Sequence, residues 1–477
     1  MLGPNRLPCE TLPGQSLGEI GESKTRWVLP VTILGSSLSF IDGSVVNVAL
    51  PVMQHGLATD LATIQWVVNG YLLSLASLIL LGGSLGDRLG QRKMFLIGLI
   101  GFAAASLICG LAPSARWLVG ARLVQGAAAA LLMPASLAII SIAYTGEKRG
   151  RAIGTWAAAG ALTMALAPVL GGWLVDTIGW RSIFLINLPI ALAAFLLALK
   201  LSPDEPTENG APLDITGTLF AVLSLALLSY GLVSIGDGQR ARGVIALIAA
   251  APAIWFFVRA ERTVPAPMMP LSLFRNATFA GANGLTVLLY AALSGALFVL
   301  PYLMIDVHGY SATAAGAAFL PFSALMGIGS RWAGGLVERV GPRPPLVLGS
   351  SITGIGYVLL ALSSGLSSYW TGVLPGLIVV AIGMTLSVAP LTTTIFDSAP
   401  TDKSGTASGI NNAAARSGGL FAVASLGLSF GGMTAPAIDA AVLSRAYSVI
   451  MFSAAVLAGL GALTAAMTIR PGLPRTR

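Results

Sequence analysis

One acid and one base interrupt long apolar stretches in the first third of the chain. Asp42 lies within the apolar segment 27–50, and Arg122 lies within the apolar segment 116–144. A charged side chain costs roughly 2.5 kcal/mol or more at the centre of a bilayer, so an ionisable residue there is a functional candidate. We expect Asp42 to take up and release a proton while Arg122 tunes its affinity for that proton. A static ion pair that only fixes helix packing is the alternative.

Other polar side chains in apolar segments are candidates for the lining of a substrate cavity. They are Asn47, Gln125, Asn411, Asn412 and Arg416. Gln125 follows Arg122 by three residues and therefore shares its helix face. Arg416 can contact an anionic group of a substrate, and a structural role is equally open to it. Buried amides more often form hydrogen bonds between helices, so that role stays open for the asparagines and the glutamine.

The composition favours a membrane protein. Hydrophobic residues make up 55% of the 477 residues, charged residues only 10%, and the mean hydropathy is +0.83. A soluble domain carries about 25% charged residues. Most of this chain must therefore face lipid, or other helices that are themselves within lipid.

Apolar segments long enough to cross a bilayer, about 20 residues each, occur fourteen times. They cover residues 27–50, 64–85, 93–112, 116–144, 151–175, 181–200, 215–235, 243–259, 277–305, 312–337, 344–363, 368–391, 404–431 and 446–469. The polar stretch 202–214 separates the first six from the others. The sequence therefore predicts an all-α polytopic membrane protein.

The basic residues are distributed unequally between the two ends of these spans. With the N-terminus on the cytoplasmic side, 20 of the 27 Lys and Arg residues fall on that side, 5 fall outside and 2 lie within spans. Short cytoplasmic loops retain Lys and Arg in this way. The net charge of +8 is thus a topology signal, and nucleic acid is not an expected partner. We predict cytoplasmic tails over 1–26 and 471–477, in the inner or plasma membrane of the cell.

A ten-residue segment occurs twice in similar form. Residues 83–92 read GSLGDRLGQR and residues 334–343 read GGLVERVGPR, each at the cytoplasmic exit of the second helix of a six-helix block. This repeat predicts two homologous halves, 27–201 and 277–470, joined by a linker over 202–276 that carries two inserted helices. Such halves, with a binding site between them at mid-membrane, suit alternating access.

The loop GGSLGDRLGQRK over residues 82–93 resembles the signature between the second and third helices of the major facilitator superfamily. Its glycines allow close approach of helices, its aspartate can contact a neighbouring helix end or an arginine, and its basic residues face the anionic membrane surface. The second copy keeps the acidic charge with a glutamate. The expected gating residues are Gly83, Gly86, Asp87, Arg88, Gly90, Arg92, Glu338 and Arg339.

Further segments are similar to the fourteen-helix drug/proton antiporter family of that superfamily. They are residues 40–51, 122–126, 167–172, 180–189 and 404–416. The resemblance implies the major facilitator fold, with two six-helix halves and two inserted transmembrane helices, and it places Asp42 and Arg122 on helices that line the central cavity.

The fifth predicted helix carries what the resemblance identifies as the antiporter motif. Its residues are Gly160, Pro168, Gly171 and Gly172, with Ala167 where the family has a glycine. A kinked helix face of small residues can pack closely on a neighbour, and we expect that neighbour to be the helix over 312–337. A simple packing kink would explain the glycines alone.

These features predict a proton-coupled antiporter that exports small hydrophobic or cationic compounds, with neutral and zwitterionic substrates left open. Uptake by proton symport is the alternative within transport. An enzyme or a non-transporting receptor is a remote alternative, because no catalytic, metal-binding or phosphate-binding pattern is present. We therefore expect no catalytic residues, no metal and no cofactor. Protons, membrane lipid and a small-molecule substrate are the expected partners of a monomer.

The two histidines are expected at the surface. His55 and His308 fall in predicted outer loops and are too isolated in the sequence to form a metal site.

Overall fold

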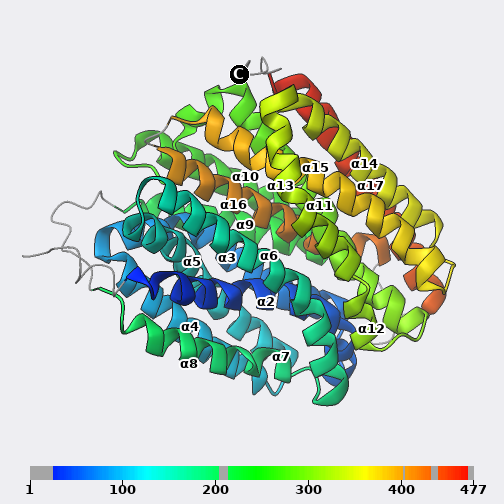
Figure 1. The fold of residues 1–477 in the computed structure, drawn as a ribbon. Coiled ribbons are helices and arrows are strands. Elements are labelled where there is room, and N and C mark those ends of the chain that lie inside the picture. The colour runs from blue at the N-terminus through cyan, green and yellow to red at the C-terminus, as the bar shows by residue number, and fades with distance from the viewer. Residues whose placement is uncertain (1–24, 203–212, 401–402, 431–438, 471–477) are drawn as a thin grey trace, which may run out of the picture.

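The computed structural model describes residues 25–202, 213–400, 403–430 and 439–470. Most of the predicted N-terminal tail, the predicted C-terminal tail and most of the polar stretch at 202–214 lie outside the described residues. Within the described residues the regular structure is entirely helical, and the two halves of the chain lie side by side (Figure 1). The predicted all-α fold is confirmed.

The first half is a bundle in which the sixth predicted span is broken. Its helices are α2 (Val28–Gly56), α3 (Leu61–Leu89), α4 (Gln91–Gly110), α5 (Ala115–Ala143), α6 (Gly146–Thr177), α7 (Ser182–Leu185) and α8 (Asn187–Ala198). Polar caps start two of them: Asp60 accepts a hydrogen bond from the Thr63 amide at 2.8 Å, and Ser114 accepts one from the Trp117 amide at 3.4 Å. Such caps satisfy amides that have no partner within the helix.

The linker forms a helical hairpin that lies against both halves. Its elements are α9 (Ile215–Gly236), α10 (Arg240–Thr263) and the short 3-10 helix η1 (Leu271–Arg275). α9 packs on α3 of the first half and on α16 (Ser404–Ser425) of the second. At its end, Gly236 meets the backbone of Gly427, where any side chain would collide.

The second half repeats the bundle, with more irregular helix ends. Besides α16 it contains α11 (Ala277–Tyr302), η2 (Leu303–Val307), α12 (Ala312–Ala317), α13 (Leu320–Val340), α14 (Arg343–Leu362), η3 (Tyr369–Val373), α15 (Leu374–Ser398), η5 (Leu426–Phe430) and α17 (Ala440–Thr468). The predicted span 312–337 is divided between α12 and α13. Pro321 stands in the first turn of α13, where a residue without an amide proton is tolerated.

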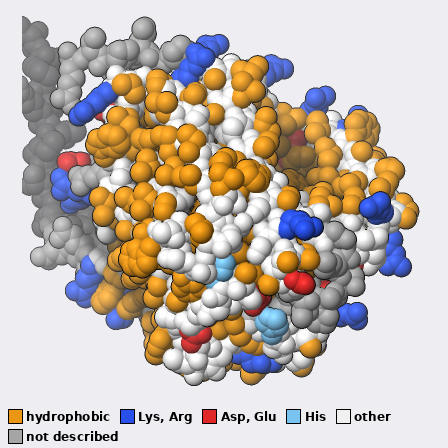
Figure 2. All heavy atoms as spheres, turned by 90° about the vertical axis from the view of Figure 1, so that its right-hand side faces the viewer, with side chains coloured by type: hydrophobic (Ala, Val, Ile, Leu, Met, Phe, Trp, Pro, Cys, Tyr) orange, Lys and Arg blue, Asp and Glu red, His pale blue; other side chains and the backbone are white. Residues whose placement is uncertain are grey.

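All fourteen predicted segments are helical in the structure. Thirteen helices of the described residues are long and apolar enough to cross a membrane, and the segment Ser182–Ala198 is a shorter apolar helix. Figure 2 shows hydrophobic side chains spread over the face that it views, with many of the Lys and Arg side chains towards its margins. The protein is a multi-pass membrane protein.

The loop repeat is also a repeat of backbone conformation. Gly90 ends α3 with φ 102°, and Gly341 ends α13 with φ 79°. Both lie in the left-handed region, which glycine adopts without the steric cost of a Cβ atom. The two glycines occupy equivalent places in the ten-residue repeat, so each half turns sharply between its second and third spans. Following the orientation predicted from the basic residues, we call this end of the molecule cytoplasmic and the opposite end outer.

Candidate functional site

Asp42 and Arg122 meet in the interior of the first half, on α2 and α5. Arg122 Nη1 donates to Asp42 Oδ2 at 2.5 Å, and Gln125 Nε2 donates to Asp42 Oδ1 at 3.0 Å. The side chains of Asp42 and Arg122 are 0% and 2% exposed. Both carboxyl oxygens accept hydrogen bonds from donors, which is the arrangement that suits a charged carboxylate.

The remaining contacts of Arg122 fix its guanidinium between helices α5 and α3. Its Nε donates to the backbone oxygen of Val67 at 3.0 Å, and its Nη1 also donates to Gln125 Oε1 at 2.7 Å. The ring of Tyr71 lies 4.3 Å from the guanidinium carbon and that of Phe184 lies 5.8 Å from it. Cation–π contacts of this kind stabilise a desolvated arginine.

Gln125 extends the network to two further helices. Its Nε2 donates to Ser106 Oγ of α4 at 2.9 Å, and Asn187 Nδ2 of α8 donates to the same hydroxyl at 3.3 Å. The thiol of Cys109 lies 3.6 Å from Gln125 Oε1. Gln125 is completely buried and therefore belongs to this network and not to an open cavity wall. Helices α2, α4, α5 and α8 are thus joined by one set of polar contacts.

Sequence reasoning missed three members of this network: Tyr71, Ser106 and Asn187. Asn187 lies in the segment 180–189 that carries the family resemblance, at the junction of α7 and α8. That position was a usable signal. Ser106 and Tyr71 had none, because isolated serines and tyrosines are common in membrane helices and their partners are distant in sequence.

The other predicted cavity residues are placed in three different ways. Asn47 donates to its own helix at the Gly43 oxygen, at 3.3 Å, and Asn412 does the same to the Ser408 oxygen at 3.0 Å. Asn411 Nδ2 donates to Thr286 Oγ1 at 2.7 Å and so joins α16 to α11. Arg416 is partly exposed and forms no hydrogen bond or ion pair with the part of the chain that the structure describes.

The small residues of α6 divide between two neighbouring helices. A methyl group at Gly160 would lie 2.7 Å from the Phe40 ring, and one at Gly171 would collide with Val45, so both face α2. Gly172 faces α12 instead, where a side chain would collide with the Ala312 backbone.

Helix α12 also contributes a glycine to its contact with α6. A side chain at Gly316 would collide with the backbone of Pro168. The expected contact of the motif with the helix over 312–337 is therefore present, on its α12 portion.

Hydrogen bonds join the two halves at the outer end. Gln54 accepts one from the Tyr302 hydroxyl at 2.8 Å, and His55 Nε2 lies 3.3 Å from Asp306 Oδ1. His55 is exposed as expected, but it is not isolated, because the folded chain brings Asp306 beside it from a helix 251 positions away. His308, also expected at the surface, is only partly exposed. The sequence expectation missed both environments because they depend on how the halves pack.

A third contact of this kind is made by Asp176 at the end of α6. Its carboxylate accepts hydrogen bonds from the amides of Ala312 and Thr313 at 3.1 and 2.7 Å, and from the Thr313 hydroxyl at 2.5 Å. These amides belong to the first turn of α12, which has free donors. A side chain of one half thus caps a helix of the other half, and the outer end is closed.

The cytoplasmic loop of the first half is tightly organised. Gln91, the first residue of α4, donates to Asp87 at 2.8 Å, and a side chain at Gly86 would collide with Gln91. Arg92 donates from Nε and Nη2 to the backbone oxygens of Ala198 and Leu199, both at 3.3 Å. A cation placed at a helix C-terminus offsets the partial negative charge of the helix dipole. Asp87 therefore reaches a neighbouring helix through a side chain, and Arg92 reaches a helix end.

Other members of the predicted loop motif are less closely packed or more exposed to solvent. A methyl group at Gly83 would make only an ordinary contact with Pro134, at 3.9 Å, and Arg88 is exposed. In the second copy, Glu338 and Arg339 are both exposed. The two copies share a backbone turn but not the contacts around it.

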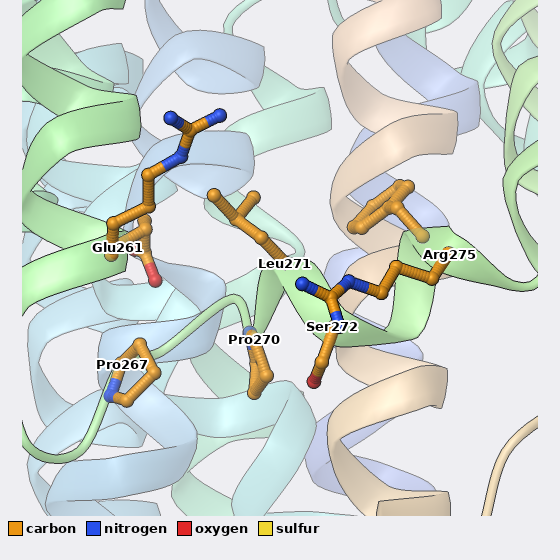
Figure 3. Close-up of a pocket in the computed structure, with 8 residues that line it drawn as sticks. Glu261, Pro267, Pro270, Leu271, Ser272 and Arg275 are labelled. Atoms are coloured by element: carbon orange, nitrogen blue, oxygen red, sulfur yellow. The ribbon is translucent and has the colours of Figure 1, made fainter.

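A separate cavity of about 720 Å³ lies at the cytoplasmic end of the linker, lined mainly by residues of α10 and η1 (Figure 3). Glu261 and Arg262 contribute to it from α10, and Ser272 and Arg275 contribute from η1. Glu261 is buried and accepts a hydrogen bond from the Met269 amide at 2.9 Å, which holds the segment between α10 and η1 against α10. None of its lining residues belongs to the Asp42 network.

Comparison with known proteins decides the family. The family model of the Major Facilitator Superfamily matches residues 32–423. The chain belongs to the major facilitator superfamily. It is accordingly a transporter and not an enzyme, and the resemblance seen in its loop motif is confirmed.

Relatives within the superfamily are resistance and export proteins. The chain is 36% identical over 405 residues to the multidrug resistance protein Stp of Mycobacterium tuberculosis, covering 84% of this chain and 74% of that protein. It is 32% identical to the tetracenomycin C resistance and export protein of Streptomyces glaucescens, covering 83% and 74%. Among solved structures, a D-xylose–proton symporter matches with a TM-score of 0.67 at 15% identity, covering 94% and 98%, which supports the major facilitator fold.

Proposed function

We propose that this major facilitator protein exports small hydrophobic compounds from the cytoplasm in exchange for protons. The direction is supported by its relatives, which are named for multidrug resistance or for resistance to an antibiotic and its export. The alternative of proton-coupled uptake has no comparable support among those relatives. The closed outer end fits one of the two end states that alternating access requires.

The observation that carries proton coupling is the enclosed network around Asp42. Each Asp42 oxygen already accepts a hydrogen bond, from Arg122 or from Gln125. A proton added to the second lone pair of either oxygen would remove the negative charge that both donors contact. Protonation would then leave the Arg122 charge without its partner in a buried site, which is costly unless the surrounding helices rearrange.

This cost links the proton to a movement of the helices. The network joins α2 and α5 to α4 and α8, and α2 also carries the outer contacts made by Gln54 and His55. A change at Asp42 can therefore bias the closure of the outer end through α2. We propose that protonation from outside, and release of the proton to the cytoplasm, drive the exchange of the two end states.

The test measures proton movement coupled to substrate in liposomes that contain the purified protein. Asp42→Asn keeps the size of the side chain and one of its two acceptor oxygens, and it cannot release a proton. We expect it to abolish substrate-dependent proton flux while substrate binding persists. Glu147→Gln is the matched control, because Glu147 forms an exposed pair with Arg151 at the surface. Proton flux that survives in Asp42→Asn at the level of the control would overturn the proposal and favour a static ion pair.

A further inference from the structure

Arg416 is a charged residue deep in a membrane helix that lacks a counterion within the described chain. It lies twelve residues into α16, about 18 Å from the start of that helix at 1.5 Å per residue. Among the described residues its guanidinium has no hydrogen bond, no ion pair and no ring stacked on it. Charged groups at membrane depth are normally paired or face a water-filled cavity or substrate path. The partial exposure of Arg416 agrees with a position facing a water-filled cavity or a substrate path.

Two tyrosines, one from each half, interact electrostatically with Arg416. Tyr71 belongs to α3 and Tyr290 to α11, and both interact electrostatically with the guanidinium. The guanidinium carbon of Arg122 lies 4.3 Å from the centroid of the Tyr71 ring. Helix α16, which carries Arg416, packs on α3 of the first half and on α11 of the second, so Arg416 stands on a helix that contacts both halves.

The acids of the described chain do not neutralise Arg416. Asp42 is completely buried and its oxygens are occupied by Arg122 and Gln125. The acids that the structure describes in the second half stand at or near the ends of helices. They are Asp306, Glu338, Asp397 and Asp439. Among the described residues, no acid forms an ion pair with Arg416 in this conformation.

We propose that Arg416 binds an anionic oxygen group, a carboxylate or phenolate, on the exported compound. This inference rests on the proposed export function and narrows its substrate class. A guanidinium can pair with a carboxylate through two parallel hydrogen bonds. Tyr290, which is partly exposed, can supply aromatic surface for a ring that carries the anionic group. The substrate class differs from the cationic compounds expected from the sequence.

Export of an anion in exchange for a proton has an electrical consequence. The anion leaves while the proton enters, so both movements are equivalent to positive charge moving towards the cytoplasm. A cytoplasm-negative potential therefore drives the exchange, in addition to the proton gradient. One-for-one exchange of a monovalent cation for a proton would be indifferent to that potential.

The experiment follows uptake of two dyes into acid-interior proteoliposomes, whose lumen stands for the outside of the cell. Fluorescein is the anionic probe, and rhodamine 6G, in which the carboxyl is esterified, is the cationic probe. We expect the wild-type protein to accumulate fluorescein, and a potassium diffusion potential positive inside the vesicles to accelerate that uptake. Vesicles without protein correct for passive distribution of each dye.

Variants assign the selectivity to the guanidinium. We expect Arg416→Gln to lower fluorescein uptake by about tenfold or more, equivalent to the loss of one good contact, with rhodamine 6G uptake maintained. Arg416→Lys keeps the charge but not the paired geometry, so its fluorescein uptake should lie between that of the wild-type protein and that of Arg416→Gln. Arg445→Gln removes an exposed arginine at the start of α17 and should behave as wild type. Size-exclusion profiles and thermal unfolding verify that each variant is folded.

The outcomes separate this inference from the proposed function. If the wild-type protein moves rhodamine 6G but not fluorescein, or if Arg416→Gln lowers both dyes equally, the anion site is overturned and proton-driven export stands. If the proton gradient drives neither dye into the vesicles with wild-type protein, the export proposal fails together with the site. Selective loss of fluorescein uptake in Arg416→Gln supports both.

Discussion

The two halves of this transporter share a fold and a sharp glycine turn, yet the charged residues within their helices differ in pairing and in burial. In the first half, Asp42, Arg122 and Gln125 satisfy one another and are sealed from solvent. In the second half, Arg416 is partly exposed and unpaired within the described chain, and Asn411 makes a simple hydrogen bond to Thr286. The shared scaffold thus holds a buried charge pair in one half and a partly exposed arginine, unpaired among the described residues, in the other.

The largest expected effect compares the two arginines. Arg122→Leu leaves the Asp42 carboxylate buried without its partner, and breaking such a pair costs about 3–5 kcal/mol. Arg416→Leu breaks no hydrogen bond or ion pair within the described chain, so the free energy of unfolding should be unchanged or higher. Thermal unfolding of the purified variants in detergent measures both. Equal destabilisation by the two substitutions would show that Arg416 has a structural partner and would remove the contrast between the halves.

A second comparison concerns the buried amides. Gln125→Leu removes the donor to Asp42 Oδ1 and leaves that buried oxygen unsatisfied, at about 1–3 kcal/mol for such a group, while Ser106 keeps its bond from Asn187. Asn411→Leu removes chiefly the bond to Thr286, and hydrogen bonds between membrane helices average about 0.6 kcal/mol. In the same thermal unfolding assay, the Gln125 variant should be clearly less stable than the Asn411 variant. The reverse order would mean that the second half contains the more cohesive polar network.

The smallest expected effect compares the two copies of the loop repeat. Gly86→Ala introduces a methyl group against the Gln91 side chain, which must move and weaken its bond to Asp87. The second copy has Val337 in place of Gly86, so its variant is made at Gly335, two positions earlier. Gly335→Ala places a methyl group in open space, and alanine is favoured over glycine in a helix by about 1 kcal/mol. We expect stability to fall slightly in the first variant and to rise in the second. Proteolysis at the cytoplasmic loops, together with unfolding, would reveal a loss of order confined to Gly86→Ala.

Much of the fold follows from local properties of the chain. Fourteen apolar segments and the unequal distribution of Lys and Arg are consequences of residue type and position alone. The meeting of Asp42 with Arg122 was also predictable, because depth along two oppositely directed helices can be counted from the sequence. The break between α7 and α8 was not, because its apolar residues read as one continuous span.

Contacts between the halves could not be predicted in the same way. Asp176 lies 136 positions before Ala312, and no sequence motif near either residue indicates that the two are in contact. Their contact depends on how two rigid bundles approach each other, which hydrophobic patterning does not specify. Ser106 and Asn187 join the candidate site for a similar reason, through helices whose rotation the apolar pattern leaves open.

The inserted hairpin gives the two sides of the molecule unequal access to the bilayer. Because α9 packs on both α3 and α16, it covers the seam between the halves on that flank, and Gly236 brings it against the backbone of Gly427. On the opposite flank, neither inserted helix packs substantially on α6 or α13 within the described residues. The hairpin therefore shields one of these two flanks from lipid acyl chains and leaves the other, along α6 and α13, uncovered.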